Sequence, residues 1–208
     1  MAKSARFMEL RRRLADLRRH MLPANFSPTG DYSDRHLDRA RGYRLLAHAE
    51  IEAFIEDITL GTAKTAVSNW SSSKKPSDVI LCLLAHYHGG YDTGAGEVFP
   101  VTSRPKTKEA IKEIVQVALK QYVALHDQNH GIREDNFNKL VLPIGIRRDE
   151  LDPTWLTDLD QFGKRRGDVA HKTVKAHQQI DPRAELQDVN KLLVGLELLD
   201  SLVQKLRN

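Results

Sequence analysis

Residues 181–206, DPRAELQDVNKLLVGLELLDSLVQKL, carry the clearest structural pattern in the chain. Asp181-Pro-Arg is typical of a helix start, and apolar side chains then recur at steps of three and four residues. They are Leu186, Val189, Leu192, Leu193, Leu196, Leu199 and Leu202. This spacing predicts a long helix with one apolar face, which must be buried against other helices.

The same periodicity recurs upstream and predicts further helices. Residues 1–22 are expected to form a basic amphipathic helix that Pro23 ends. A long second helix begins at Ser33 or Asp34 and runs toward Trp70, with Gly61 as a site for a bend. A third is predicted from Thr107 or Lys108, and Asp152-Pro is typical of another helix start. Strand signals are weak throughout, so we predict an all-α fold.

We expect a single domain over residues 1–208, with a long irregular loop insertion around residues 86–106. That segment is rich in glycine, and Pro100 and Pro105 follow. The apolar run Val79–Ala85 just before it is short enough to be either a helix or a buried strand.

Composition excludes several classes of protein. Hydrophobic residues make up 40% and charged residues 29% of the 208, the balance of an ordinary globular protein rather than a disordered or fibrous one. Val79–Ala85 is the longest unbroken apolar run, far below the roughly 20 residues that span a bilayer, so no membrane association is expected. The single cysteine, Cys82, fits a reducing compartment, and no apolar segment follows the N-terminal charges. These features predict a cytoplasmic protein.

The charge is only mildly basic, at +4, but it is unevenly distributed. Residues 1–20 hold seven Lys and Arg against two acids, and a second basic cluster surrounds residues 164–175. Two such clusters are compatible with a polyanionic partner such as RNA. The N-terminal arginines could equally form a solvated helix face or the rim of a dimer.

The second cluster contains the most informative motif, GKRRGDVAHK at residues 163–172, which places Arg166 five residues before His171. A guanidinium offers a rigid fork of donors for phosphate oxygens, and an imidazole exchanges protons near neutral pH. Together they could promote attack on a phosphodiester without a metal. The spacing alone is also compatible with a solvated basic face.

Two other sequence patterns could indicate a ligand site. His126 and His130 stand four residues apart, a spacing that can bind zinc, but no third ligand is evident in the sequence. The glycines at 89–96 form no phosphate-binding Walker motif. We therefore expect neither a metal nor a cofactor.

The motif at residues 163–172 resembles the signature of the HEPN superfamily, an all-α group marked by Arg-x4–6-His before the last helices. Arg166, Ala170 and His171 match it, and Arg165 offers an alternative arginine. Gly167 stands where the family usually has Asn. Residues 43–55 and 136–146 resemble segments of the RiboL-PSP-like branch, so we expect a HEPN-like helical bundle.

The resemblance implies a metal-independent endoribonuclease that leaves 2′,3′-cyclic phosphate ends, as a toxin or antiviral-defence effector. It assigns His171 as general acid or base and Arg166 to the phosphorane charge. Glu50 and Asp168 become auxiliary residues. The basic residues expected to bind RNA are Lys164, Arg165 and Lys172. It also implies a homodimer that pairs two motifs, with an antitoxin or sensor protein as a further candidate partner.

The alternative interpretation is a non-catalytic HEPN-like module that binds RNA or a protein, in which Gly167 marks a degenerate site.

Overall fold

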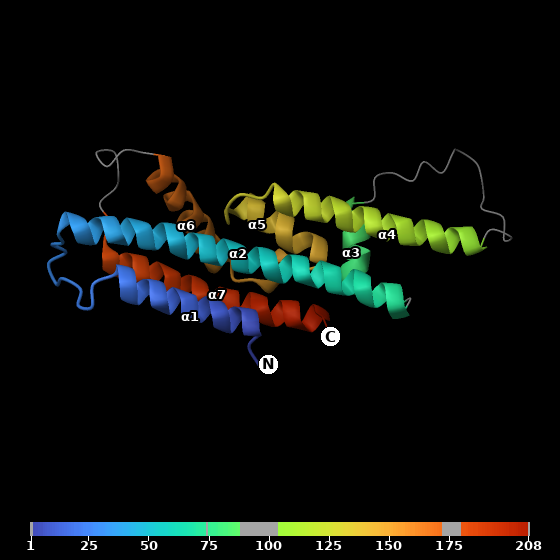
Figure 1. Cartoon of the computed structure of the whole chain (residues 1–208), viewed down its shortest axis with the longest axis horizontal. Helices are drawn as coiled ribbons and strands as arrows, with labels where there is room; N and C mark the ends of the chain where they lie inside the picture. The colour runs from blue at the N-terminus through green and yellow to red at the C-terminus, as the bar shows by residue number, and fades with distance from the viewer. Residues whose placement is uncertain (1, 74, 88–103, 172–179, 208) are drawn as a thin grey trace.

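The structure, a computed structural model, describes residues 2–73, 75–87, 104–171 and 180–207, without the side chains of 104–110 and 168–171. Within these residues every regular element is helical and none is a strand, which confirms the predicted all-α class (Figure 1). The elements are α1 (Ala5–Met21), α2 (Asp34–Ser73), α3 (Asp78–Tyr87), α4 (Arg104–Asp127), α5 (Glu134–Val141), the 3₁₀ turns η2 (Leu142–Ile144) and η3 (Arg148–Glu150), α6 (Pro153–His171) and α7 (Pro182–Arg207).

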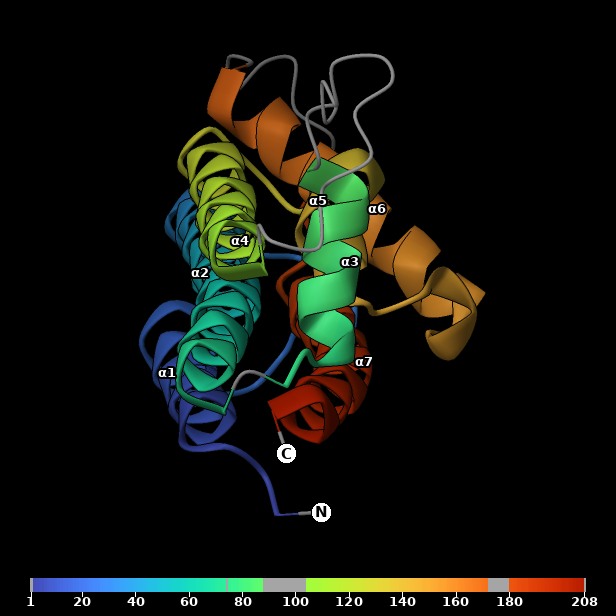
Figure 2. The ribbon, with the colours of Figure 1, turned by 90° about the vertical axis from the view of Figure 1, so that its right-hand side faces the viewer.

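The bundle is built around α2, which runs for 40 residues without interruption. Helices α1, α3, α4, α5, α6 and α7 all contact it. Viewed along the bundle, α1, α2 and α4 form one column, with α3 and α7 beside it (Figure 2). Buried side chains occur along most of α2, from Ala40 to Trp70, so this one helix supplies a large part of the core.

Gly61 does not bend α2, contrary to the prediction. A Cβ at this position would lie 2.9 Å from Nη2 of Arg207, at the end of α7. The glycine leaves room for that guanidinium to donate to the carbonyl of Ile58, at 2.8 Å, and to Thr62 Oγ1, at 2.9 Å. Gly61 therefore gives the Arg207 side chain the space to reach α2 in this position.

The apolar segment before the expected loop, which the sequence left open between helix and strand, is helical. Val79–Ala85 lies in α3, where Val79, Ile80 and Leu83 are buried. Residues 86 and 87 also belong to α3, and α4 begins at Arg104, three residues before the predicted start. The rest of the expected loop, residues 88–103, lies outside the described residues.

A polar contact near each end of α7 joins this helix to the rest of the bundle. Ser4 caps α1 by accepting from the Phe7 amide, and its own amide and hydroxyl donate to the buried Asp200 of α7, at 2.9 and 2.5 Å. At the opposite end, Arg44 of α2 forms a two-pronged ion pair with Glu185 of α7, and both side chains are largely buried. None of the described helices has the length and apolar character needed to cross a membrane.

Replacing Glu185 with Ala is expected to lower the free energy of unfolding by about 3–5 kcal/mol, because the Arg44 guanidinium would remain buried without its partner. Urea denaturation followed by circular dichroism measures this. The matched control is Glu197→Ala, whose exposed ion pair with Lys3 should contribute no more than about 1 kcal/mol. Equal losses in the two variants would contradict the assigned role of the buried pair.

Candidate active site

Helix α6 presents the predicted motif, and its position is fixed by packing on α2 and α7. Asp152 caps its start by accepting from the Thr154 amide, at 2.7 Å, with Pro153 as the first helical residue as predicted. Trp155 donates to the carbonyl of Leu192 on α7, at 3.0 Å. One turn before Arg166, the fully buried Phe162 stacks on the His48 ring of α2, with centroids 6.1 Å apart. The basic segment that follows is therefore held over the middle of α2.

The two adjacent arginines of the motif have different surroundings. Arg165 donates to Asp188 of α7, at 2.6 Å, and is half-buried. Arg166 is exposed and forms no ion pair within the described part of the chain. Of the two arginines that the sequence left open, Arg165 holds α6 to α7, whereas the Arg166 side chain is exposed.

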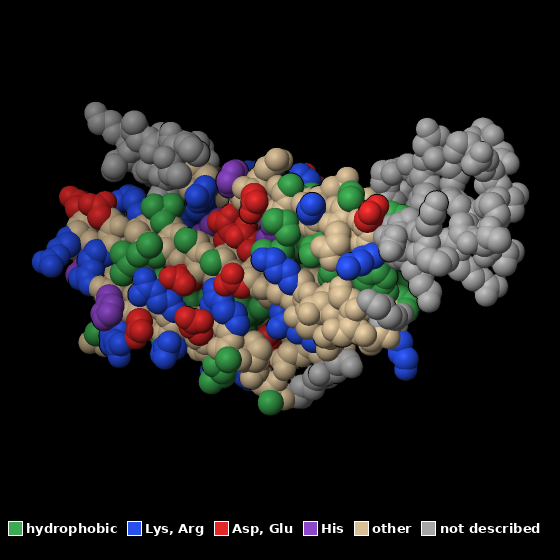
Figure 3. Space-filling model, turned by 45° about the vertical axis from the view of Figure 1, so that its right-hand side comes forward, with side chains coloured by type: hydrophobic (Ala, Val, Ile, Leu, Met, Phe, Trp, Pro, Cys, Tyr) green, Lys and Arg blue, Asp and Glu red, His purple; other side chains and the backbone are tan. Residues whose placement is uncertain are grey.

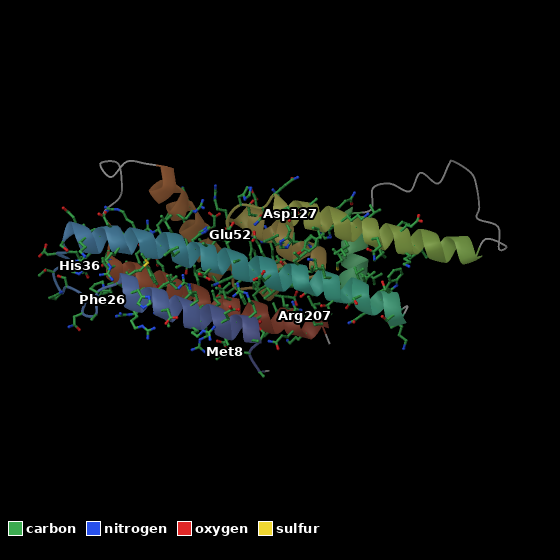
Figure 4. The ribbon with its side chains drawn as sticks, in the orientation of Figure 1. Met8, Phe26, His36, Glu52, Asp127 and Arg207 are labelled. Carbon is green, nitrogen blue, oxygen red and sulfur yellow. The ribbon has the colours of Figure 1, made fainter. Side chains whose placement is uncertain are left out.

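Glu52, which Figure 4 labels on α2, is a carboxylate whose pKa is affected by the charge of Arg166. Glu52 accepts a hydrogen bond from the backbone amide of Gly131, in the turn between α4 and α5. Its carboxylate also lies 3.4 Å from Nδ1 of the buried His48. Glu52 thus joins α2 to the α4–α5 turn.

Burial alone would raise the pKa of the Glu52 carboxyl. Hydrogen bonds from His48 and the Gly131 amide, followed by the charges of His48 and Arg166, outweigh burial and lower that pKa. Glu52 is therefore an anion at neutral pH, and the charge of Arg166 is one of the influences that favour this form.

A second carboxylate, Glu56, lies one turn further along α2 and holds the same α4–α5 turn. Asn129 donates to Glu56 at 3.1 Å and to the carbonyl of Gly131 at 3.2 Å. Gly131 has a φ of +108°, a left-handed conformation that favours glycine. Burial is the main cause that raises the pKa of Glu56, and the charge of the exposed His130 partly opposes it. The turn therefore brings His130 to the same acidic stretch of α2.

The remaining residues predicted for the site are placed as follows. Glu50 pairs with Arg13 of α1, at 2.9 Å, so the structure does not bring it to Arg166. Lys164 is exposed on α6. Asp168 and His171 belong to α6 by their backbone, but their side chains lie outside the described residues, as does all of Lys172.

The two histidines considered as zinc ligands have different surroundings, since His126 is buried and His130 is exposed. His126 is buried, lies 3.1 Å from Thr59 Oγ1 through Nε2, and meets the Tyr122 ring edge-on. Burial lowers the pKa of His126 and favours its neutral form. Among the residues whose side chains are described, no three His, Cys, Asp or Glu are close enough to hold a metal ion.

The basic N-terminal helix is largely paired with acids. Arg6 contacts Asp57 at 2.7 Å, and Lys3 contacts Glu197 at 2.8 Å. The space-filling view accordingly shows basic and acidic side chains interspersed over this face, and no continuous basic band (Figure 3). These contacts favour the interpretation of α1 as a solvated, ion-paired face.

Sequence reasoning missed Glu52, His48 and the Asn129–Gly131 turn. The spacing of His48, Glu52 and Glu56, at i, i+4 and i+8, puts all three on one helix face, and this signal was available. The turn that meets this face comes from 70 residues away and has no local signature.

Replacing Glu52 with Gln is expected to cost about 1 kcal/mol of stability at pH 7, because a charge-assisted hydrogen bond becomes a neutral one. A carboxyl with a lowered pKa stabilises the fold above its ordinary pKa of 4.5. That contribution is lost as the pH falls through the lowered value. The difference between wild type and variant should therefore shrink toward zero below about pH 4.5, as urea titrations across pH would show.

Glu56→Gln is the matched control, because the pKa of Glu56 is raised and its ionised form is disfavoured by burial. This variant should be as stable as wild type at pH 7 or slightly more stable. A loss at pH 7 as large as that of Glu52→Gln would contradict the distinct roles of the two carboxylates.

Comparison with known sequences supports the all-helical fold. The sequence model of the RiboL-PSP-HEPN family matches residues 8–208, nearly the whole chain. No curated protein and no solved structure matches the chain significantly.

Proposed function

We propose, from the premise that this chain belongs to the RiboL-PSP-HEPN family, that it is a metal-independent endoribonuclease. HEPN domains are frequently ribonucleases or RNA-binding modules, and they often dimerise. The observation that carries the proposal for this chain is the exposed Arg166, which lies within the electrostatic reach of Glu52 and five residues before His171 on the same helix.

The chemistry follows from these two side chains. The ribose 2′-OH attacks the adjacent phosphorus, the P–O5′ bond breaks, and a 2′,3′-cyclic phosphate and a 5′-OH are formed. One group removes the 2′-OH proton and another protonates the leaving 5′ oxygen, so no net proton is consumed. His171 serves as one of these groups. Arg166, whose charge interacts with that of the Glu52 anion, stabilises the charge on the pentacoordinate phosphorane.

A second proton-transfer group is needed, and one motif supplies one imidazole. In our proposal a homodimer places the motifs of two copies together, so that one His171 acts as base and the other as acid. Cleavage of cellular or phage RNA by such a dimer would inhibit growth, which suits a toxin or defence effector.

Purified wild-type protein is expected to cleave RNA in excess EDTA and to leave cyclic-phosphate ends. Arg166→Ala and His171→Ala should each lower the rate by at least about 100-fold, the usual scale for losing a charge-stabilising or proton-transfer group. Gel analysis with end-group mapping measures both quantities. Arg12→Ala, which removes an exposed arginine of α1, is the matched control and should stay within about twofold of wild type.

Cleavage that persists in both site variants would overturn the assignment of these residues. Absence of cleavage by a folded wild-type dimer would favour the alternative function, a non-catalytic module that binds RNA or protein.

One observation bears on that alternative. Gly167 occupies the position where the family usually has Asn, yet no described atom lies within 4 Å of where its Cβ would be. Its backbone is that of an ordinary helix, so packing does not demand a glycine there. The effect of this departure from the family signature can therefore be tested by replacing Gly167.

Gly167→Ala is expected to stabilise the protein by about 0.5–1 kcal/mol, because alanine replaces glycine inside a helix without a clash. Thermal denaturation measures the change. Gly167→Asn should likewise fold, and in the cleavage assay it should match or exceed wild type. A Gly167→Asn protein that cleaves while wild type does not would identify wild type as the degenerate form.

A further inference from the structure

A broad, open pocket of about 590 Å³ lies between the end of α3, the second half of α4 and the start of α5. Its volume lies within the range of roughly 300–1,000 Å³ that ligand pockets occupy. The side chains that matter below are Tyr87, Gln121, Gln128, Asn129, Asn136 and Lys139. None of them belongs to the predicted Arg166–His171 motif.

Four carboxamides line this pocket, which gives it both donors and acceptors. Gln121 and Gln128 are exposed and make no hydrogen bond with the described residues. Asn136 uses its Nδ2 to donate to the carbonyl of His130, at 2.8 Å, and this leaves its oxygen for a ligand. Asn and Gln side chains pair with the edges of nucleobases, which also present donors and acceptors side by side.

The pocket also provides an aromatic ring and a cation. Tyr87 is half-buried against Tyr122, with ring centroids 6.0 Å apart, so its position is fixed. Lys139 is exposed and forms no ion pair within the described part of the chain. An aromatic face stacks on a base, and an ammonium attracts the phosphate attached to it.

The composition of the lining disfavours other ligands. It contains no carboxylate among the described residues, so it does not suit a metal ion or a cationic ligand. Its amides would lose hydrogen bonds with water if an apolar helix covered them.

The pocket is linked to the candidate active site through Asn129. This side chain is 8% exposed, lines the pocket and donates to Glu56 on α2. Two residues further along the same turn, the Gly131 amide donates to Glu52, the carboxylate whose charge interacts with Arg166. A strand of RNA passing Arg166 could therefore continue over the turn into the pocket.

We propose that this pocket is a subsite for one nucleotide of single-stranded RNA, adjacent to the phosphate that is cleaved. The carboxamides read the base edge, Tyr87 stacks on the base and Lys139 holds a phosphate. This proposal rests on the proposed ribonuclease function, because it takes the RNA strand to run from Arg166 over the α4–α5 turn into the pocket.

The first test measures binding without cleavage. A fluorescent 2′-O-methyl oligonucleotide lacks the attacking hydroxyl, so its affinity can be followed by anisotropy with the full-length protein. Gln121→Ala, Gln128→Ala and Lys139→Ala alter exposed side chains and should each weaken binding by about 3- to 10-fold. Gln187→Ala and Lys191→Ala remove the same kinds of exposed side chain from α7 and should leave the affinity unchanged. Equal affinities in the pocket and control variants would overturn the proposal.

The second test identifies the part of the nucleotide that is recognised. Amide chemical shifts of the labelled protein are recorded with a nucleoside monophosphate, with the nucleoside and with inorganic phosphate. We expect the monophosphate to shift residues around 121, 128 and 139 more strongly than either fragment does. Identical shifts from phosphate alone would overturn base recognition, and no shift at these residues would overturn the subsite.

The two proposals fail in different ways. Arg166→Ala should abolish cleavage and retain most of the oligonucleotide affinity at the pocket. If pocket variants weaken binding but wild type cuts no RNA, the ribonuclease function fails and the nucleotide subsite stands. If wild type cuts RNA and pocket variants bind and cut as wild type does, the subsite alone fails.

Discussion

The unbroken course of α2 is the constraint on which the other elements depend. Its 40 residues form a rod of roughly 60 Å, against which every other α-helix packs. A helix of this length could not remain straight and buried without partners on several sides. Gly61 shows how closely they approach, since it leaves just enough room for Arg207 to bond the carbonyl of Ile58.

The candidate active site uses the same helix. Glu52 meets the α4–α5 turn through the Gly131 amide, contacts the buried His48 and interacts with the charge of Arg166. A buried anion is stable only when such partners compensate its lost hydration. The arrangement therefore joins α2 to the α4–α5 turn, and the charge of Arg166 on α6 favours the same anion. The neighbouring Arg165 is paired with Asp188, whereas Arg166 forms no ion pair with the side chains that the structure describes.

Much of the fold was predictable because helical periodicity is a local signal. The apolar stripes gave α1, α2 and α7 correctly, and the Asp152-Pro signature located the start of α6. Val79–Ala85 could not be assigned because seven apolar residues fit either a helix or a buried strand. Gly61 was misread as a bend because its role depends on Arg207, nearly 150 residues away.

The site was predictable in part. The Arg166–His171 spacing and the family resemblance located the motif, and the family match over residues 8–208 agrees with that assignment of family. The auxiliary carboxylate was predicted to be Glu50, yet the structure pairs Glu50 with Arg13, and it is Glu52 whose pKa is affected by the charge of Arg166. Glu50 and Glu52 are two positions apart on α2, so their side chains leave the helix in directions about 200° apart. Choosing between these two carboxylates therefore requires the positions of α1 and α6. The contact between the α4–α5 turn and α2 is a tertiary contact that has no signature in the sequence.

The central claim is that RNA lies across the end of α6 and the α4–α5 turn, and ultraviolet crosslinking tests it most directly. A non-cleavable oligonucleotide carrying 4-thiouridine would be crosslinked to the wild-type protein, and the adducts located by mass spectrometry. The account predicts adducts in residues 128–139 and 160–171. Adducts confined to the arginine-rich face of α1 would contradict it.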